Sequence, residues 1–228
     1  PFSEEIVVVD SGSTDDTCGS ARRFTDKVMH QDWLGYGRQK QFALEQASCE
    51  WVLSIDADEE VPAELRTEIE QLEFARDGYF LPRKVWYLNR WILHGGWYPG
   101  YVMRLFRRDR ARFTEEILHE SVVIEGSTGQ LSNPLAHYSY RDIADHVAKI
   151  NEFTSLAARQ MKAKGRGAGP LQLTLSPSFE FLRMYLAKGG CLDGFPGLVV
   201  AGLHAYYVFL KYAKLWELGR ASAGKSGA

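Results

Sequence analysis

Short apolar runs and amphipathic segments alternate along the first third of the chain. The apolar runs are rich in β-branched residues, which is typical of strands buried in a parallel sheet. The expected elements are strands over residues 5–9 and 51–55, and helices over residues 15–24, over residues 36–47 and from Pro62 onward. In the last helix Leu65, Ile69 and Leu72 share one face. Strands that alternate with helices predict an α/β fold.

The rest of the chain changes from strands to helices. We expect strands over residues 79–87, 101–107 and 121–125. Ser139 and Asp142 form a capping box that predicts a helix ending at Gly165. Its expected buried side consists of Ile143, Val147, Ile150, Leu156 and Met161. A further helix is expected from Ser176 to about Lys188, followed by an apolar stretch over residues 195–210.

These elements predict three regions. We expect a main α/β domain over residues 1–138, a helix over residues 139–165 that packs on it, and amphipathic helices over residues 170–220. The apolar runs of the last region are shorter than the ~20 residues that span a bilayer, so a position in the membrane interface is expected. The alternative is a helix hairpin packed on the domain, or a dimer contact. The flanking basic residues are Lys188, Lys211, Lys214 and Arg220.

Composition narrows the class of protein. Apolar residues make up 45% of the 228 residues, which is enough for a packed core, and the net charge of -2 gives no electrostatic reason to expect nucleic acid as a partner. Cys18, Cys49 and Cys191 fit neither a disulfide framework nor a zinc motif, so a reducing compartment is expected. The sequence begins at Pro1 rather than Met, and a predicted strand follows within a few residues, so we expect the true N-terminus to be missing from this sequence.

The acidic motif Asp56-Ala57-Asp58 directly follows the second predicted strand. Two carboxylates two residues apart can share a hard cation, and Mg²⁺ or Mn²⁺ often bridges such carboxylates to a diphosphate. The alternative is a solvated acidic loop. A phosphatase motif of the form Asp-x-Asp-x-Thr would also follow a strand, but Glu60 stands in the place of its threonine.

A second polar motif, Asp10-Ser11-Gly12-Ser13-Thr14-Asp15, follows the first predicted strand. It is similar to the Asp-Thr-Gly-Ser loop of aspartic proteases, but the second copy that a single-chain protease requires is absent. The other interpretation is a helix cap. Ligands of open α/β sheets bind beyond the carboxyl ends of strands, so we expect both motifs at one ligand-binding edge.

Together the two motifs resemble family 2 glycosyltransferases with the GT-A fold. The resemblance covers roughly residues 4–160 and continues in Gly37-Arg38-Gln39-Lys40, in Ala43 and in the three motifs at residues 104–108, 118–120 and 135–137. Within that family the chain is most similar to lipopolysaccharide inner-core β-1,4-glucosyltransferases, which act on a heptose. The implied fold is a Rossmann-like mixed sheet flanked by helices, with a C-terminal helical extension. Members of the family begin with a strand that supplies another base or ribose contact, and we expect this first strand to be missing from the sequence.

The resemblance also implies a donor site for a UDP-hexose and a divalent metal, Mg²⁺ or Mn²⁺. Asp10, with Ser11 and Gly12, would bind the nucleotide base. Asp56 would contact the ribose, or the metal through water, and Asp58 would be the direct metal ligand. Lys40 would neutralise phosphate, although a role on the helix surface is an open alternative. His137 would complete the metal site, with a hydrogen-bonded core histidine as the alternative.

The implied reaction is inverting transfer of a hexose, glucose from UDP-glucose, to a lipopolysaccharide core heptose or a similar membrane-anchored glycan. Glu120 is the expected general base, with Glu116 as its rival, and many members of the family have Glu-Asp where this chain has His119-Glu120. The implied location is the cytoplasmic face of the inner membrane. The alternatives are transfer to a polyprenyl phosphate or another surface polysaccharide, and a non-catalytic nucleotide-sugar-binding protein.

Aromatic side chains gather in the middle of the sequence. They are Trp86, Tyr87, Trp91, Trp97, Tyr98 and Tyr101. Aromatic rings stack on the apolar faces of sugars, so these residues are a candidate acceptor surface. Packing inside a subdomain core is the other interpretation.

Overall fold

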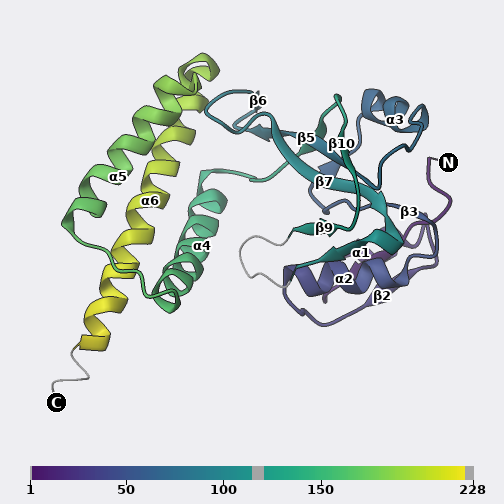
Figure 1. Ribbon diagram of the computed structural model, residues 1–228, viewed down its shortest axis with the longest axis horizontal. Helices are drawn as coiled ribbons and strands as arrows, with labels where there is room; N and C mark the ends of the chain where they lie inside the picture. Colours follow the sequence, from purple (N-terminus) through teal and green to yellow (C-terminus); the bar gives the residue numbers. More distant parts are fainter. Residues whose placement is uncertain (1, 115–120, 224–228) are drawn as a thin grey trace. The chain divides into compact units, whose positions relative to one another are not determined.

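The computed structural model describes residues 2–114 and 121–223, with side chains as far as Arg220 (Figure 1). The chain divides into two compact units. The N-terminal unit comprises residues 1–82 and 101–135, and the C-terminal unit comprises residues 83–100 and 136–228. The second boundary falls close to the expected one at residue 138. Residues 83–100, which the sequence analysis assigned to the main domain, belong to the C-terminal unit instead.

The N-terminal unit combines helices with a mixed sheet. Its helices are α1 (Thr17–Ala21), α2 (Tyr36–Gln46), α3 (Ala63–Glu70) and a 3₁₀ turn (Arg108–Arg110). Its strands are β1 (Val8–Asp10), β2 (Val28–His30), β3 (Trp51–Leu53), β4 (Glu59–Glu60), β7 (Gly100–Arg107), β8 (Ala111–Phe113), β9 (Val122–Ile124) and β10 (Thr128–Gln130). Three strands extend across the boundary into the second unit: β5 (Gly78–Tyr87), β11 (Leu135–His137) and β7, through its first residue Gly100.

Three sheets organise these strands. The largest has the order β3-β7-β5-β11-β4, with β10 and β6 (Arg90–Ile92) also paired to β5. In it β3 runs antiparallel to β7, whereas β10 runs parallel to β5. The strands β1 and β2 form a separate parallel pair, and β8 and β9 an antiparallel one. The sheet is therefore mixed, as expected.

Two apolar clusters form the core of the N-terminal unit. One of them buries Leu65 and Ile69, which lie one turn apart on α3, against Leu81 and Leu105 of the sheet. The second consists of Leu44, Met103, Phe106 and Phe113. The predicted face of α3 is thus confirmed, since its apolar positions recur at helical spacing.

The C-terminal unit is mainly helical. It contains β6 (Arg90–Ile92), α4 (Ile143–Ala163), α5 (Pro170–Leu182), a π-helical turn (Arg183–Ala187), a 3₁₀ turn (Gly190–Asp193) and α6 (Gly194–Ala223). The long helix α6 packs against both α4 and α5 (Figure 1). Its first turn comes so close to the preceding turn that a Cβ on Gly197 would lie 1.9 Å from the Gly190 carbonyl oxygen. Only glycine fits at that position.

Residues 83–100 join this unit because their apolar side chains complete its core. Val85, Tyr87 and Ile92 pack with Met184 and Val200. The Tyr87 hydroxyl lies 3.1 Å from Nδ1 of His146, a buried residue of α4. For Tyr87, packing inside a subdomain core is therefore the correct interpretation.

Two details of the helix predictions are wrong. The N-cap of α4 is Asp142, whose carboxylate accepts a hydrogen bond from the Asp145 backbone N–H at 2.7 Å, while the Ser139 hydroxyl contacts the ring of His137 instead. Ile143, placed on the buried side, is exposed, and of the five predicted positions only Ile150 is fully buried. The buried side is formed by His146, Ile150, Thr154, Ala157 and Ala158.

Helix α5 begins six residues earlier than Ser176 and includes Pro177. Pro170 occupies its first turn, where the missing N–H costs no hydrogen bond. Within the described residues, no helix combines the length and the apolar content needed to cross a bilayer.

Candidate functional site

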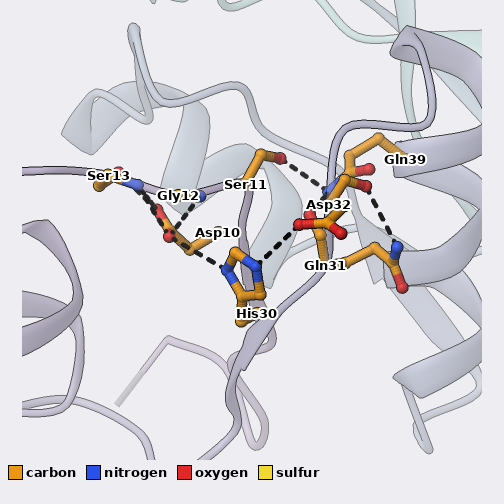
Figure 2. A network of polar contacts seen from close by, with 8 residues as sticks. All are labelled: Asp10, Ser11, Gly12, Ser13, His30, Gln31, Asp32 and Gln39. Atoms are coloured by element: carbon orange, nitrogen blue, oxygen red, sulfur yellow. Dashed lines mark hydrogen bonds and ion pairs between the residues drawn. The ribbon is translucent and has the colours of Figure 1, made fainter.

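The loop after β1 is built around the carboxylate of Asp10 (Figure 2). This carboxylate accepts hydrogen bonds from the backbone N–H groups of Gly12 at 2.8 Å and Ser13 at 3.0 Å, and from the Ser13 hydroxyl. Gly12 has φ +102°, a conformation that glycine adopts readily. The hydrogen bonds from Ser13 and Gly12 lower the pKa of Asp10 to about 2. Asp10 is therefore an ionised acceptor that fixes the shape of the loop.

Histidine and glutamine side chains support this loop from β2 and α2. Nδ1 of His30 lies 3.9 Å from the Asp10 carboxylate, and its Nε2 lies 3.1 Å from Asp32 (Figure 2). The buried Gln39 amide donates to the Ser11 hydroxyl at 2.9 Å and to the Gln31 carbonyl at 3.2 Å. Ser11 is thus held by a helix that begins 25 residues later in the chain.

The loop after β3 carries an ion cluster centred on Asp56. Lys40 Nζ lies 2.7 Å from Asp56 Oδ1, and an Arg104 guanidinium nitrogen contacts Oδ2. The same Arg104 nitrogen lies 2.7 Å from Glu59, whose side chain is fully buried. The second oxygen of Glu59 accepts a hydrogen bond from the Asp56 backbone N–H at 3.1 Å. Two cations and two carboxylates are therefore paired in one network.

The electrostatics of Asp56 reflect these partners. Burial raises the pKa of Asp56, but the charges of Arg104 and Lys40 outweigh it, so the net shift is downward. Arg104 is buried as well, and its Nε is the one buried side-chain nitrogen or oxygen among the described residues with no hydrogen-bond partner. Asp56 is consequently a permanent anion whose two oxygens each face a cation.

Helix α2 connects the two loops. Its consecutive residues Gln39 and Lys40 contact Ser11 of the first loop and Asp56 of the second. Both motifs therefore lie beside the same turn of α2, each just beyond the end of a strand. This is the arrangement that the sequence analysis expected of a ligand-binding edge.

The residues suit a divalent metal only in part. Carboxylate oxygens are the ligands that Mg²⁺ and Mn²⁺ prefer, and Asp58 is half-buried in the turn before β4. Both oxygens of Asp56 are paired with cations, so direct ligation by Asp56 would require Lys40 or Arg104 to move. Among residues 2–114 and 121–223, no group of three His, Cys, Asp or Glu side chains is arranged to hold a metal. Substrate oxygens would have to complete the coordination of a metal on Asp58.

The other predicted site residues lie in the C-terminal unit or outside the described residues. His137 belongs to the C-terminal unit, where its Nδ1 lies 2.7 Å from the Ser139 hydroxyl. Glu116, His119 and Glu120 lie outside the described residues. The expected roles of His137 and Glu120 therefore stay predictions.

Three functional residues had no assigned role in the sequence analysis. Gln39, Glu59 and Arg104 hold the two loops, yet each was noted only as part of a motif. The only sequence feature that could have indicated a role for Glu59 was its position directly after Asp58. For Arg104, 48 residues from Asp56, sequence spacing carries no information about the contact.

The chain belongs to glycosyltransferase family 2. The model of the family described as "Glycosyl transferase family 2" matches residues 3–120, about half of the chain. The mixed α/β architecture with C-terminal helices expected from this resemblance is confirmed.

Individual relatives agree with this assignment. The chain is 33% identical to the lipopolysaccharide core biosynthesis glycosyltransferase LpsC of Rhizobium meliloti (strain 1021), over 93% of this chain and 83% of the relative. It is 32% identical to an uncharacterized glycosyltransferase of Rickettsia typhi, over 95% and 79% of the two chains. A crystal structure of S. aureus TarS 1–349 with UDP-GlcNAc covers 97% of this chain and 84% of that one, with 16% identity and a TM-score of 0.43. That structural similarity is too low to support a conclusion about this chain.

Proposed function

We propose that this protein is an inverting hexosyltransferase that moves glucose from UDP-glucose to a heptose of the lipopolysaccharide core or to a similar membrane-anchored glycan. The observation that carries the proposal is the double contact of α2, through Gln39 with Ser11 and through Lys40 with Asp56. This double contact brings the loop of Asp10 and the loop of Asp56 to one turn of α2, which supports a donor site that both loops share. The similarity to LpsC, a lipopolysaccharide core biosynthesis glycosyltransferase by name, supports the acceptor class.

In this proposal the residues of the N-terminal unit bind the donor. Asp10, with Ser11 and Gly12, accepts hydrogen bonds from the nucleotide base, for which an ionised carboxylate suits well. Asp56 holds Lys40 and Arg104 in place and contacts the ribose. Asp58 would hold Mg²⁺ or Mn²⁺, and the metal when bound would neutralise charge on the departing diphosphate.

The reaction itself requires a base for the acceptor. The acceptor hydroxyl oxygen attacks the anomeric carbon of the sugar, the bond from that carbon to the diphosphate oxygen breaks, and the hydroxyl proton passes to Glu120. Removal of a general base typically lowers the rate about 10²- to 10⁴-fold. Glu120→Gln should therefore lower kcat by that order and leave UDP affinity unchanged. A near-normal kcat would rule out Glu120, and Glu116→Gln would then be the next variant.

The metal assignment is tested by calorimetry of UDP with Mn²⁺. Asp58→Asn should abolish metal-dependent UDP binding, whereas Asp26→Asn, a change at an exposed aspartate outside the two loops, should leave it unchanged. Equal binding by the two variants would contradict the role of Asp58.

Transfer is tested by incubating the protein with UDP-glucose, Mn²⁺ and lipopolysaccharide that ends at a core heptose. The expected product is heavier by one hexose. Transfer to a polyprenyl phosphate or to another surface polysaccharide instead would replace the acceptor assignment but keep the enzyme class. UDP-glucose binding with no transfer to any acceptor would favour a non-catalytic binding protein. The location that fits the proposal is the cytoplasmic face of the inner membrane.

A further inference from the structure

An apolar stripe runs along the outer side of α5 and the π-helical turn that follows it. Its members recur every three or four residues, which places them on one helical face, and their exposed fractions range from 52% to 69%. We call them the outer stripe: Leu171, Leu175, Phe179, Leu182 and Leu186. The opposite side of this segment packs on α6, with Met184 buried against Val200. The stripe is therefore an unpartnered face of a well-packed helix.

Basic side chains lie at both ends of the outer stripe. Before α5 they are Lys162, Lys164 and Arg166, and at its far end they are Arg183 and Lys188. The one acidic residue in this part of the chain, Glu180, is held by Arg183 at 2.6 Å. Uncompensated positive charge thus flanks the apolar side chains, and this charge favours an anionic partner.

A cavity of about 400 Å³ opens beside the stripe, between α5 and α6. Leu175 and Phe179 of the outer stripe form one wall, and Val208 and Tyr212 of α6 line the other side. Lys211 lies in the same lining, 5.0 Å from the centre of the Tyr212 ring. Ser176 and Glu180 complete the lining, so the cavity joins apolar and charged side chains directly beside the stripe.

We infer that the outer stripe docks the protein on an anionic lipid bilayer, with α5 lying in the plane of the interface. Amphipathic helices bind in this way when apolar side chains enter the acyl region and basic residues meet anionic headgroups. A second copy of the chain is a poorer occupant, because two identical stripes would bring like charges together. The biological use of the docking, access to a lipid-linked acceptor, rests on the proposed function.

The test measures binding of the whole chain to vesicles of phosphatidylcholine alone and of phosphatidylcholine with phosphatidylglycerol. Strong binding is expected only with the anionic lipid, and it should weaken as salt is raised. Phe179→Ser should lower the partition coefficient by about tenfold or more. The matched control is Phe24→Ser, because Phe24 of the N-terminal unit is 77% exposed and lies far from α5 in the sequence. This control should bind like the parent.

The charges are tested separately. Lys164→Gln combined with Arg166→Gln should reduce binding to anionic vesicles on the order of 30-fold. Equal binding of the parent protein to neutral and anionic vesicles, or equal binding of Phe179→Ser and Phe24→Ser, would overturn the inference. A protein that does not bind vesicles but forms a concentration-dependent dimer, which Phe179→Ser dissociates, would overturn the inference. The stripe would then bind a second copy of the chain.

This outcome is independent of the catalytic proposal. Hydrolysis of UDP-glucose in solution, without vesicles, should be the same in the parent and in the Phe179→Ser variant. A protein that binds anionic vesicles through the stripe but never uses UDP-glucose would refute the proposed function alone. A protein that turns over UDP-glucose but does not bind vesicles would refute the docking surface alone.

Discussion

Replacement of Arg104 by methionine tests the ion cluster most directly. The guanidinium is almost fully buried and contacts both Asp56 and Glu59. Methionine keeps much of the length and apolar volume of the arginine side chain but removes its charge. Asp56 would retain Lys40 at 2.7 Å, whereas the carboxylate of Glu59, whose side chain is fully buried, would lose its ion pair with Arg104.

The expected cost follows from the burial of Glu59. Removing one partner of a buried ion pair destabilises a protein by about 3–5 kcal/mol, because a buried charge is left uncompensated. An exposed ion pair contributes only about 0–1 kcal/mol. Arg107 lies on the same strand and pairs with Asp109 at 3.2 Å on the surface. We therefore expect Arg104→Met to lower the free energy of unfolding by about 3–5 kcal/mol and Arg107→Met by less than about 1 kcal/mol.

The assay is denaturant-induced unfolding followed by tryptophan fluorescence, since Trp51 of β3 lies in the core of this unit. The double variant Arg104→Met/Glu59→Gln provides a further check. If the cost arises from the loss of Arg104 beside the buried Glu59 carboxylate, the second substitution should restore part of the stability, which gives a coupling energy of about 1–3 kcal/mol.

Two results would refute this reasoning. Equal destabilisation by Arg104→Met and Arg107→Met would show that burial of the Arg104–Glu59 pair adds nothing to the free energy of unfolding. Strict additivity of Arg104→Met and Glu59→Gln would show that the two side chains do not act as a pair in the folded protein.

Three further predictions concern other buried polar groups. Asp193→Ala should destabilise the C-terminal unit by about 3 kcal/mol or more, measured by denaturant unfolding. The reason is that this carboxylate accepts hydrogen bonds from the backbone N–H groups of Leu93 and His94 and lies 2.9 Å from the His94 ring. His146→Gln should reduce the loss of stability on acidification. Burial lowers the pKa of His146 from 6.5 to about 4, so the unfolded chain binds the proton before the folded protein does. The stability that is present above pH 6.5 therefore declines as the pH falls towards 4. A variant with an unchanged pH profile would contradict this role. Asp10→Asn should speed hydrogen exchange of the Gly12 and Ser13 amides that Asp10 accepts from, and calorimetry should show weaker UDP binding. Unchanged exchange would count against the role of the carboxylate in fixing the shape of the loop.

Hydrophobic and polar patterns in the sequence predicted those helices and strands whose bounds depend mainly on their own residues. Helix α2 covers Tyr36–Gln46 against an expected 36–47, and β7 covers Gly100–Arg107 against an expected 101–107. The start of α4 was misplaced because Ser139 and Asp142 are both good caps. In the folded protein Asp142 caps the helix, while the Ser139 hydroxyl contacts the His137 ring. The start of α5 was misplaced because Pro177 was taken as a helix start, whereas Pro170 occupies the first turn.

The site was predictable where its residues follow strands and unpredictable where they pair at a distance. Asp10 and Asp56 each lie at or just beyond the end of a strand, where α/β sheets bind ligands, although β1 and β3 belong to different sheets. The partners of Asp56 come from α2 and β7, elements whose approach depends on the packing of the whole unit. Sequence spacing therefore indicated the loops but not the cations that hold them.

The pairing within the ion cluster also limits how a diphosphate can be held. Lys40 and Arg104 each face an oxygen of Asp56, and Arg104 also pairs with Glu59, so the cluster has no net charge. A diphosphate that recruited either cation would have to take it from Asp56 and leave a carboxylate without its partner. A divalent ion held by Asp58 would bring its own positive charge to the diphosphate, so neither cation would have to leave Asp56. The two aspartates of the motif thus have different tasks in our proposal: Asp56 keeps the cations in place, and Asp58 holds the metal.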